Sequence, residues 1–157
     1  MALLNIEDIR IEFPSRRGTL VAVDGVSLSL EKGEILGVVG ESGAGKSTIG
    51  NAVIGLLEAP GRLAGGSVLL NGERIDTLTP AQKRKVRGRR IGMIFQDPLT
   101  SLDPLQTVES QLVETMQVHL NLSHAEAKKR AVQLLVQVGI DQPEPVSYTH
   151  LTLPTKA

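Results

Sequence analysis

The residues best suited to chemistry in this sequence are eight in a row at positions 40–47, GESGAGKS. Successive backbone N–H groups in such a glycine-rich turn form a concave nest for phosphate oxygens, and a helix that begins there adds the positive end of its dipole. Lys46 would reach the β- and γ-phosphate oxygens of a nucleoside triphosphate, and the Ser47 hydroxyl would take one position on Mg²⁺. The motif therefore predicts a loop that binds triphosphate together with magnesium.

A glycine-rich turn that binds nothing is the alternative, and the flanking residues argue against it. Residues 34–39, EILGVV, form a short apolar run typical of a buried strand that leads into the loop. Residues 47–57 have the apolar spacing of a helix. A strand followed by the loop and then a helix is the context that a phosphate-binding loop requires.

Further strands surround this unit in the predicted fold. Residues 3–13 and 20–30 carry mostly alternating apolar residues and predict two strands joined by a turn at 14–18. Residues 67–70 predict a short strand closed by the turn pair Asn71-Gly72, and residues 91–95 predict another buried strand. The fold class is therefore α/β, a parallel core with antiparallel strands added.

Helices dominate the later part of the chain. Thr79-Pro80-Ala81-Gln82 marks the start of a short helix that runs to about residue 88. A second helix is predicted from residue 107, and the capping box at residues 123–126 opens a third. We place the boundary between the α/β core and these helices near residues 100–106.

Composition excludes several classes of protein. Acidic and basic residues balance at 17 each, so the net charge predicts neither nucleic-acid binding nor attraction to an acidic membrane. The basic cluster at 83–90 is best interpreted as a solvated helix face, because no aromatic residues are interleaved to stack on bases. With no cysteine in these 157 residues, disulfides and thiolate metal sites are excluded, and no apolar run approaches the length of a membrane span.

A second polar motif follows the strand predicted at 91–95: Gln96-Asp97, within the phrase FQDPLTSLDP at 95–104. Together with the phosphate loop, it closely resembles the Q-loop of ATP-binding cassette (ABC) ATPases. The phrase is similar in particular to the importer group that serves dipeptide, oligopeptide, nickel and glutathione uptake. Residues 22–27 (AVDGVS), 40–43 (GESG) and 90–95 (RIGMIF) agree with the same group, so the resemblance covers about residues 3–142.

The resemblance implies a P-loop ATPase core with antiparallel β additions at 1–105 and the start of a helical subdomain at 106–144. It implies that Gln96 helps to place the magnesium and the attacking water. By this resemblance Gln96 and Ser47 would bind the metal, and Gln96 and Lys46 would be the catalytic residues. ATP and Mg²⁺ would be held by Gly40, Ser42, Gly43, Ala44, Gly45, Lys46, Ser47 and Thr48.

By the same resemblance, the protein is the ATPase subunit of an importer, peripheral on the cytoplasmic face of the cell membrane. Its expected partners are membrane permease subunits, a second ATPase subunit and, indirectly, a solute-binding protein. Nucleic acid is not an expected partner. ATP hydrolysis would drive uptake of di- or oligopeptides or a related solute. A non-transport cassette ATPase, such as a DNA-repair or translation factor, is the alternative, and a fragment that does not hydrolyse ATP is another.

Two departures from the family pattern affect these expectations. Near the second strand, where an aromatic often stacks on adenine, this chain offers Arg16, Arg17 and Gly18, with Phe13 the nearest ring. The signature segment, the strand that ends in a catalytic glutamate, and the histidine loop have no counterpart. We therefore expect the C-terminal half of the fold to be missing, the fragment alone to be inactive, and residues 145–157 to be a non-family tail. No histidine or glutamate is assigned as a general base.

Overall fold

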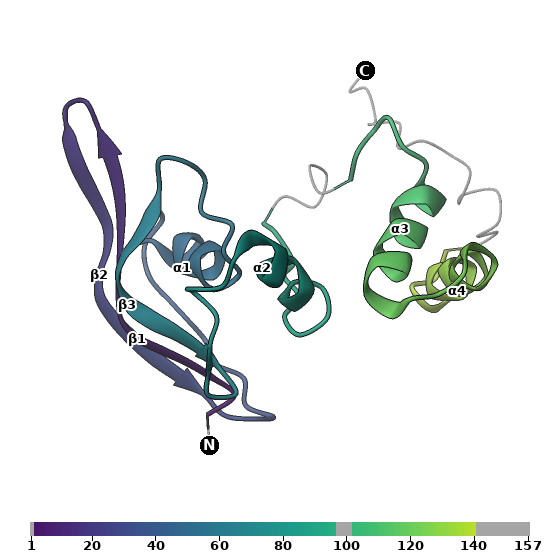
Figure 1. The fold of residues 1–157 in the computed structure, drawn as a ribbon, viewed down its shortest axis with the longest axis horizontal. Coiled ribbons are helices and arrows are strands. Elements are labelled where there is room, and N and C mark those ends of the chain that lie inside the picture. The colour runs from purple at the N-terminus through teal and green to yellow at the C-terminus, as the bar shows by residue number, and fades with distance from the viewer. Residues whose placement is uncertain (1, 97–101, 141–157) are drawn as a thin grey trace. The chain divides into compact units, whose positions relative to one another are not determined.

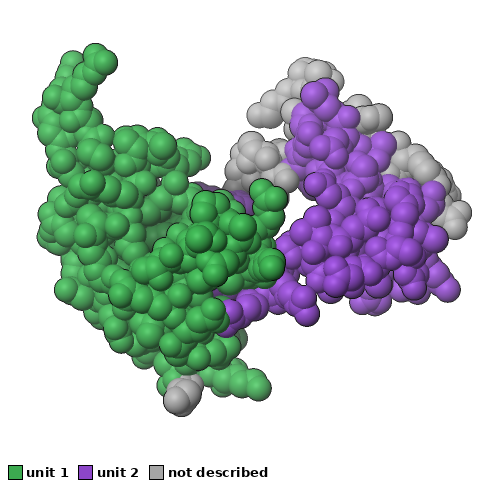
Figure 2. Space-filling view, in the orientation of Figure 1, with its two compact units in different colours: residues 1–87 green, residues 88–157 purple. Residues whose placement is uncertain are grey.

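Residues 2–96 and 102–140 are described by a computed structural model, and the chain divides into two compact units (Figures 1 and 2). The first unit comprises Met1–Arg87 and the second Gly88–Ala157. The sheet and the first two helices belong to the first unit, and the last two helices belong to the second. The tail predicted at 145–157 and residues 97–101 of the phrase at 95–104 lie outside the described residues.

The first unit is built on a four-stranded antiparallel sheet with the order β2-β1-β3-β4. The strands predicted at 3–13 and 20–30 are confirmed, as is the tight turn at Asn71-Gly72, where both residues have positive φ. The strand predicted at 67–70 begins earlier than expected and includes Gly65 and Gly66. The strand bounds are β1 Leu4–Ser15, β2 Gly18–Leu30, β3 Arg62–Leu70 and β4 Glu73–Arg74.

A bulge in β1 explains why its apolar residues alternate only in part. Ile6 pairs with Leu28 and Ile9 with Val26, so three steps along β1 match two along β2. Asp8 occupies the extra position with a φ of 47°, and its N–H donates to the Ser27 hydroxyl at 2.8 Å. Without the extra residue Ile6 and Ile9 would face opposite sides of the sheet. With it, both are buried in the core.

Two predicted strands are wrong for the part of the chain that the structure describes. Residues 34–39 form neither helix nor strand, and Ile35 and Val39 are 96% and 94% exposed. Residues 91–95 contribute one bridge residue at Ile91, and Ile94 is 95% exposed. A strand exists only where a neighbour completes its backbone hydrogen bonds, and no described strand pairs with either segment. The described sheet is accordingly antiparallel throughout, without the parallel core that we expected.

Two short helices accompany the sheet in the first unit. Helix α1, Lys46–Val53, follows the phosphate loop and ends before the predicted limit at 57. Helix α2, Pro80–Val86, begins as predicted: the Thr79 side chain accepts from the Gln82 N–H, and the Gln82 side chain accepts from the Thr79 N–H. Proline at the first helical position fits because that residue needs no hydrogen-bond donor.

The second unit contains two helices that pack together, α3 Val108–Leu120 and α4 His124–Gln137. Thr107 caps α3, and Ser123 with Glu126 forms the predicted capping box of α4. Glu109 of α3 pairs with Lys128 of α4 at 3.3 Å. Neither these helices nor any other in the described ranges is long and apolar enough to cross a membrane. Val113, Met116, Ala127 and Ala131 form the buried contact.

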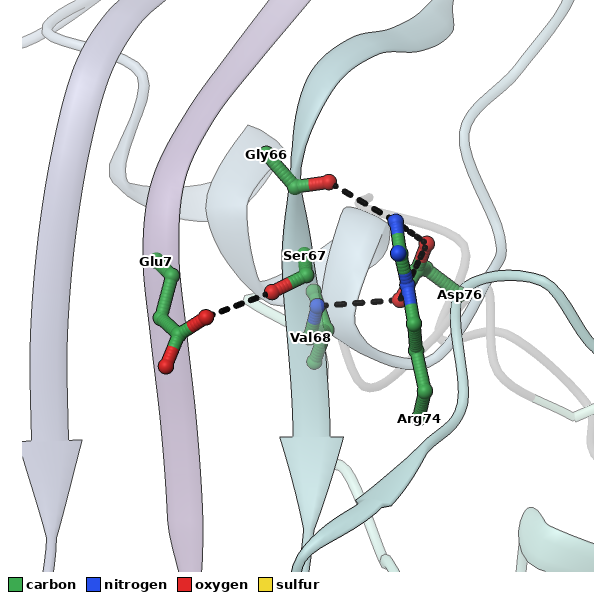
Figure 3. A network of polar contacts seen from close by, with 6 residues as sticks. All are labelled: Glu7, Gly66, Ser67, Val68, Arg74 and Asp76. Atoms are coloured by element: carbon green, nitrogen blue, oxygen red, sulfur yellow. Dashed lines mark hydrogen bonds and ion pairs between the residues drawn. The ribbon is translucent and has the colours of Figure 1, made fainter.

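Asp76, just after β4, links β3 to β4 through its side chain (Figure 3). Its carboxylate accepts from the Val68 N–H at 3.0 Å and pairs with the Arg74 guanidinium at 3.1 Å, while its side chain is only 8% exposed. Arg74 also donates to the Gly66 carbonyl at 3.1 Å. Burial alone would raise the pKa of Asp76, but the hydrogen bonds from Arg74 and Val68 lower it below its ordinary value of 3.8.

This pKa direction predicts a loss of stability in acid. A carboxylate whose pKa is depressed by folding contributes stability above its unfolded pKa and loses it as the pH falls through the lower folded value. We expect Asp76→Asn to reduce the free energy of unfolding by about 1–2 kcal/mol at pH 7. The difference from wild type should shrink below pH 4. Urea titrations between pH 7 and pH 2 test this, with the exposed Glu58→Gln as a charge-matched control. A difference that stays constant with pH contradicts it.

Candidate functional site

The loop predicted to bind phosphate is closed by its own backbone. The Ala44 N–H donates to the Glu41 carbonyl at 3.2 Å, and the Ile49 N–H donates to the Gly45 carbonyl at 2.9 Å, which starts helix α1. Gly43 and Gly45 have φ values of 84° and 83°. Residues 40–44 are exposed, so a ligand can reach the turn. The first N–H groups of α1, which have no partner within the helix, lie at the same place.

Lys46 crosses this loop and holds its two sides together. The Nζ atom donates to the carbonyls of Gly40 and Glu41, each at 2.7 Å. The side chain is half-buried, and its stem lies 3.8 Å from the Cβ that would be built at Gly40. An ammonium group has three donors. The Lys46 ammonium lies beside the carbonyls of Gly40 and Glu41. At this position the anionic oxygens of a ligand could replace the two carbonyl oxygens as its partners.

Gly45 fixes the loop against the sheet. Ile11 pairs with Val23 and its neighbour Glu12 with Val21, so Ala22 is an extra residue in β2. A Cβ at Gly45 would lie 2.9 Å from the Ala22 carbonyl oxygen and 3.0 Å from Val23 Cγ2. Only glycine fits both this approach and the positive φ. The bulge in β2 thus provides the surface on which the last glycine of the loop rests.

The C-terminal end of α1 is held by two side chains of the basic cluster. Arg87 donates from Nε to the Ile54 carbonyl at 2.8 Å and from Nη2 to the Gly55 carbonyl at 3.1 Å. The stem of Lys83 covers Gly55, where a Cβ would be 2.8 Å from Lys83 Cδ. Both basic residues are half-buried, so the expectation of a wholly solvated face is wrong for them. No signal in the sequence indicated this role, because Gly55 lies within the helix predicted at 47–57 and did not mark its end.

The structure brings together the residues predicted to hold ATP, and it leaves the position of Gln96 as a prediction. Gln96 belongs to the second unit and lies exposed on a segment with neither helix nor strand. No group of three or more acidic or histidine side chains that could hold a metal occurs among the described residues. The residues gathered in the first unit are Gly40, Ser42, Gly43, Ala44, Gly45, Lys46, Ser47 and Thr48.

The candidates for contact with a nucleobase differ in their environment. Arg16 and Arg17 form the exposed turn between β1 and β2. Phe13 is half-buried, and its ring lies so close to Gly61 that a Cβ there would be 2.5 Å from Cε1. One side of the Phe13 ring is thus occupied by the turn at 58–61. The two arginines are accessible to a base, whereas one side of the Phe13 ring already packs against Gly61.

Comparison with known proteins agrees with the geometry of the loop. A family model described as ABC transporter matches residues 23–153. The chain belongs to the ABC transporter family. The match begins in β2 and includes the whole phosphate loop, α1 and the segment that carries Gln96. The resemblance inferred from the loop and from Gln96 is confirmed at the level of the family.

Relatives of this ABC chain are peptide transport proteins. It is 47% identical over 141 residues to the oligopeptide transport ATP-binding protein OppD of Escherichia coli (strain K12) and covers 42% of that protein. It is 40% identical over 143 residues to the dipeptide transport ATP-binding protein DppD of the same strain and covers 44% of it. OppD of Bacillus subtilis (strain 168) is 44% identical over 143 residues, with 40% covered. The alignments include 90%, 91% and 90% of this chain, which spans less than half the length of these relatives.

Solved structures confirm the fold class. The ABC chain matches the ATP-binding cassette MJ0796, solved as a dimer in a post-hydrolysis state bound to ADP and Pi, with a TM-score of 0.79. That match has 23% identity and covers 94% of this chain and 61% of the other. A second dimeric structure of MJ0796 gives a TM-score of 0.77 at 22% identity, with the same coverage. The expected α/β cassette fold is therefore present, although the two strands predicted around the loop do not form.

The contact between Gly45 and β2 predicts different costs for two glycines of one loop. Gly45→Ala should lower the free energy of unfolding by about 2–5 kcal/mol, since left-handed strain adds to overpacking against Ala22. Gly43→Ala is the matched control, because it has the same φ but nothing within 4 Å of the added Cβ. It should cost only about 1–2 kcal/mol. Denaturant unfolding without nucleotide measures both, and equal costs would show that the contact with β2 does not fix the loop.

Proposed function

We propose that this chain is the ATP-binding part of the ATPase subunit of an ABC importer for peptides or a related solute. The observation that carries the proposal is the position of Lys46, whose ammonium bridges the Gly40 and Glu41 carbonyls across a glycine-rich turn. The turn opens helix α1, so backbone N–H groups and a positive charge converge on one exposed concavity. Such a donor set suits a chain of phosphates better than any neutral ligand.

Phosphate binding would replace contacts that the protein now makes with itself. Lys46 would exchange its carbonyl partners for β- and γ-phosphate oxygens, while the N–H groups of residues 42–48 would surround the phosphates. The exposed Ser47 hydroxyl, at the start of α1, would serve one coordination position of Mg²⁺. Magnesium bound with the nucleotide supplies charge neutralisation at the γ-phosphate. No covalent nucleophile is required, because phosphoryl transfer depends mainly on positioning and electrostatic stabilisation.

Gln96 completes the proposal for hydrolysis. We assign its amide to the magnesium and the attacking water, so that it would orient the water and respond to the γ-phosphate. Its exposed position on a segment with neither helix nor strand leaves the amide accessible for this role. An amide can accept from water and donate to phosphate at the same time.

The names of the relatives support the transport assignment. OppD and DppD are named for oligopeptide and dipeptide transport, and both align with about nine-tenths of this chain. By analogy, the partners of the whole protein are permease subunits, a second ATPase subunit and, indirectly, a solute-binding protein. Its location would be the cytoplasmic face of the cell membrane. The dimeric form of the MJ0796 cassette supports pairing of ATPase subunits.

Substitution of Lys46 tests the phosphate assignment directly. Lys46→Ala should weaken binding of MgATP by roughly 10- to 100-fold, since a hydrogen bond to a charged group contributes about 1.5–3 kcal/mol. Isothermal titration calorimetry with MgATP on the full chain measures the change. Lys32→Ala, which removes an exposed lysine elsewhere in the first unit, is the matched control and should bind as wild type does.

Two results would contradict the assignment. One is equal affinity of the Lys46→Ala and wild-type chains for MgATP. The other is binding by wild type that does not distinguish ATP from adenosine, because the loop offers its charge and N–H groups to the phosphates and not to the base.

A further inference from the structure

We infer that Arg87 is a positioning residue for the phosphate loop, acting through the C-terminal end of helix α1. This inference rests on the proposed function, because it concerns the affinity of the same loop for nucleotide. Arg87 lies 41 positions after Lys46 and belongs to no motif that the sequence singled out for chemistry. Its side chain nevertheless contacts the far end of the helix that Lys46 begins.

The contact is made with both carbonyls that follow the last turn of α1. Nε donates to the Ile54 carbonyl at 2.8 Å and Nη2 to the Gly55 carbonyl at 3.1 Å, in a part-buried setting. These oxygens lie at the negative end of the helix dipole, where a cation is favoured. The backbone ends there in a tight turn, since the Leu56 N–H donates to the Asn51 carbonyl at 2.8 Å and Gly55 has a φ of 66°.

Helix α1 needs this support because it is short and weakly packed. It has eight residues, and isolated helices of that length are unstable in water. Within its bounds Ala52 is buried and the other residues, apart from the exposed Ser47, are half-buried, so the helix packs only in part. The N-terminal end rests on β2 at Gly45. At the C-terminal end the backbone is held by the buried Ile54 side chain, by Arg87 and by the stem of Lys83 over Gly55.

A restraint at this end reaches the loop because the helix is a short rigid body. Eight residues rise by about 12 Å, so a shift at the C-terminal end turns the helix about the point at Gly45 where its N-terminal end rests on β2. The Lys46 ammonium and the first N–H groups of α1 change direction with the helix. Phosphate affinity depends on donors that are held in place before the ligand arrives. Loss of Arg87 should therefore lower nucleotide affinity without removing any group that touches nucleotide.

Three variants of the full chain separate this role from a general loss of stability. Arg87→Ala should raise the dissociation constant for MgATP about tenfold. Calorimetry measures this constant at a temperature at which circular dichroism shows that the variant is fully folded. Arg87→Lys keeps the charge but cannot present a fork to two carbonyls, so it should recover only part of the affinity. Arg84→Ala is the matched control: the same charge is lost from an exposed position of α2, and the affinity should not change.

Hydrogen exchange on the nucleotide-free chain gives an independent measurement. Arg87→Ala should accelerate amide exchange at residues 49–56 and leave β1 and β3 unchanged. Faster exchange with unchanged MgATP affinity would overturn the inference, because α1 would then be loosened without consequence for the loop. Unchanged exchange would overturn it as well. If the wild-type chain does not bind MgATP, the proposed function fails, and the exchange measurement still decides whether Arg87 positions α1.

Discussion

The candidate site depends on a helix too short to be stable by itself. Helix α1 has eight residues, buries one of them, and carries the phosphate loop at its N-terminal end. Both of its ends are therefore held by other parts of the first unit. Gly45 rests on the bulge of β2 at one end, and Arg87 binds the carbonyls of Ile54 and Gly55 at the other. The bulge in β2 and two residues of the basic cluster, Lys83 and Arg87, thus support the site through α1.

Local signals in the sequence predicted most of the elements correctly. Both capping boxes, the turn at Asn71-Gly72 and the first two strands depend on residues within a few positions of one another, and the structure has all of them. The strands predicted at 34–39 and 91–95 do not form, because an apolar run indicates only that burial of its side chains is favourable. Whether it becomes a strand depends on a neighbour that completes its hydrogen bonds, and no described strand does so.

The supporting contacts of the site could not have been predicted from the sequence. Arg87 and Lys83 lie in a run of basic residues whose ordinary reading is a solvated surface, and nothing local indicates that two of them fold onto another helix. The bulge at Ala22 is equally hidden, since an extra residue in a strand becomes visible only from its pairing. In contrast, a phosphate-binding loop can be predicted from the sequence alone, because it requires fixed residue types at fixed spacing.

The loop keeps its closed form even though the segment before it is not part of a sheet. Ile35 and Val39 are almost fully exposed, yet Lys46 still bridges the carbonyls of Gly40 and Glu41. The interactions that define the loop therefore lie within it and after it. Residues 40–49 supply the backbone turn and the ammonium, and the contacts of α1 orient them. A strand before the loop would make the loop more rigid and would fix the direction from which the backbone enters it. The loop does not need this strand to present its hydrogen-bond donors.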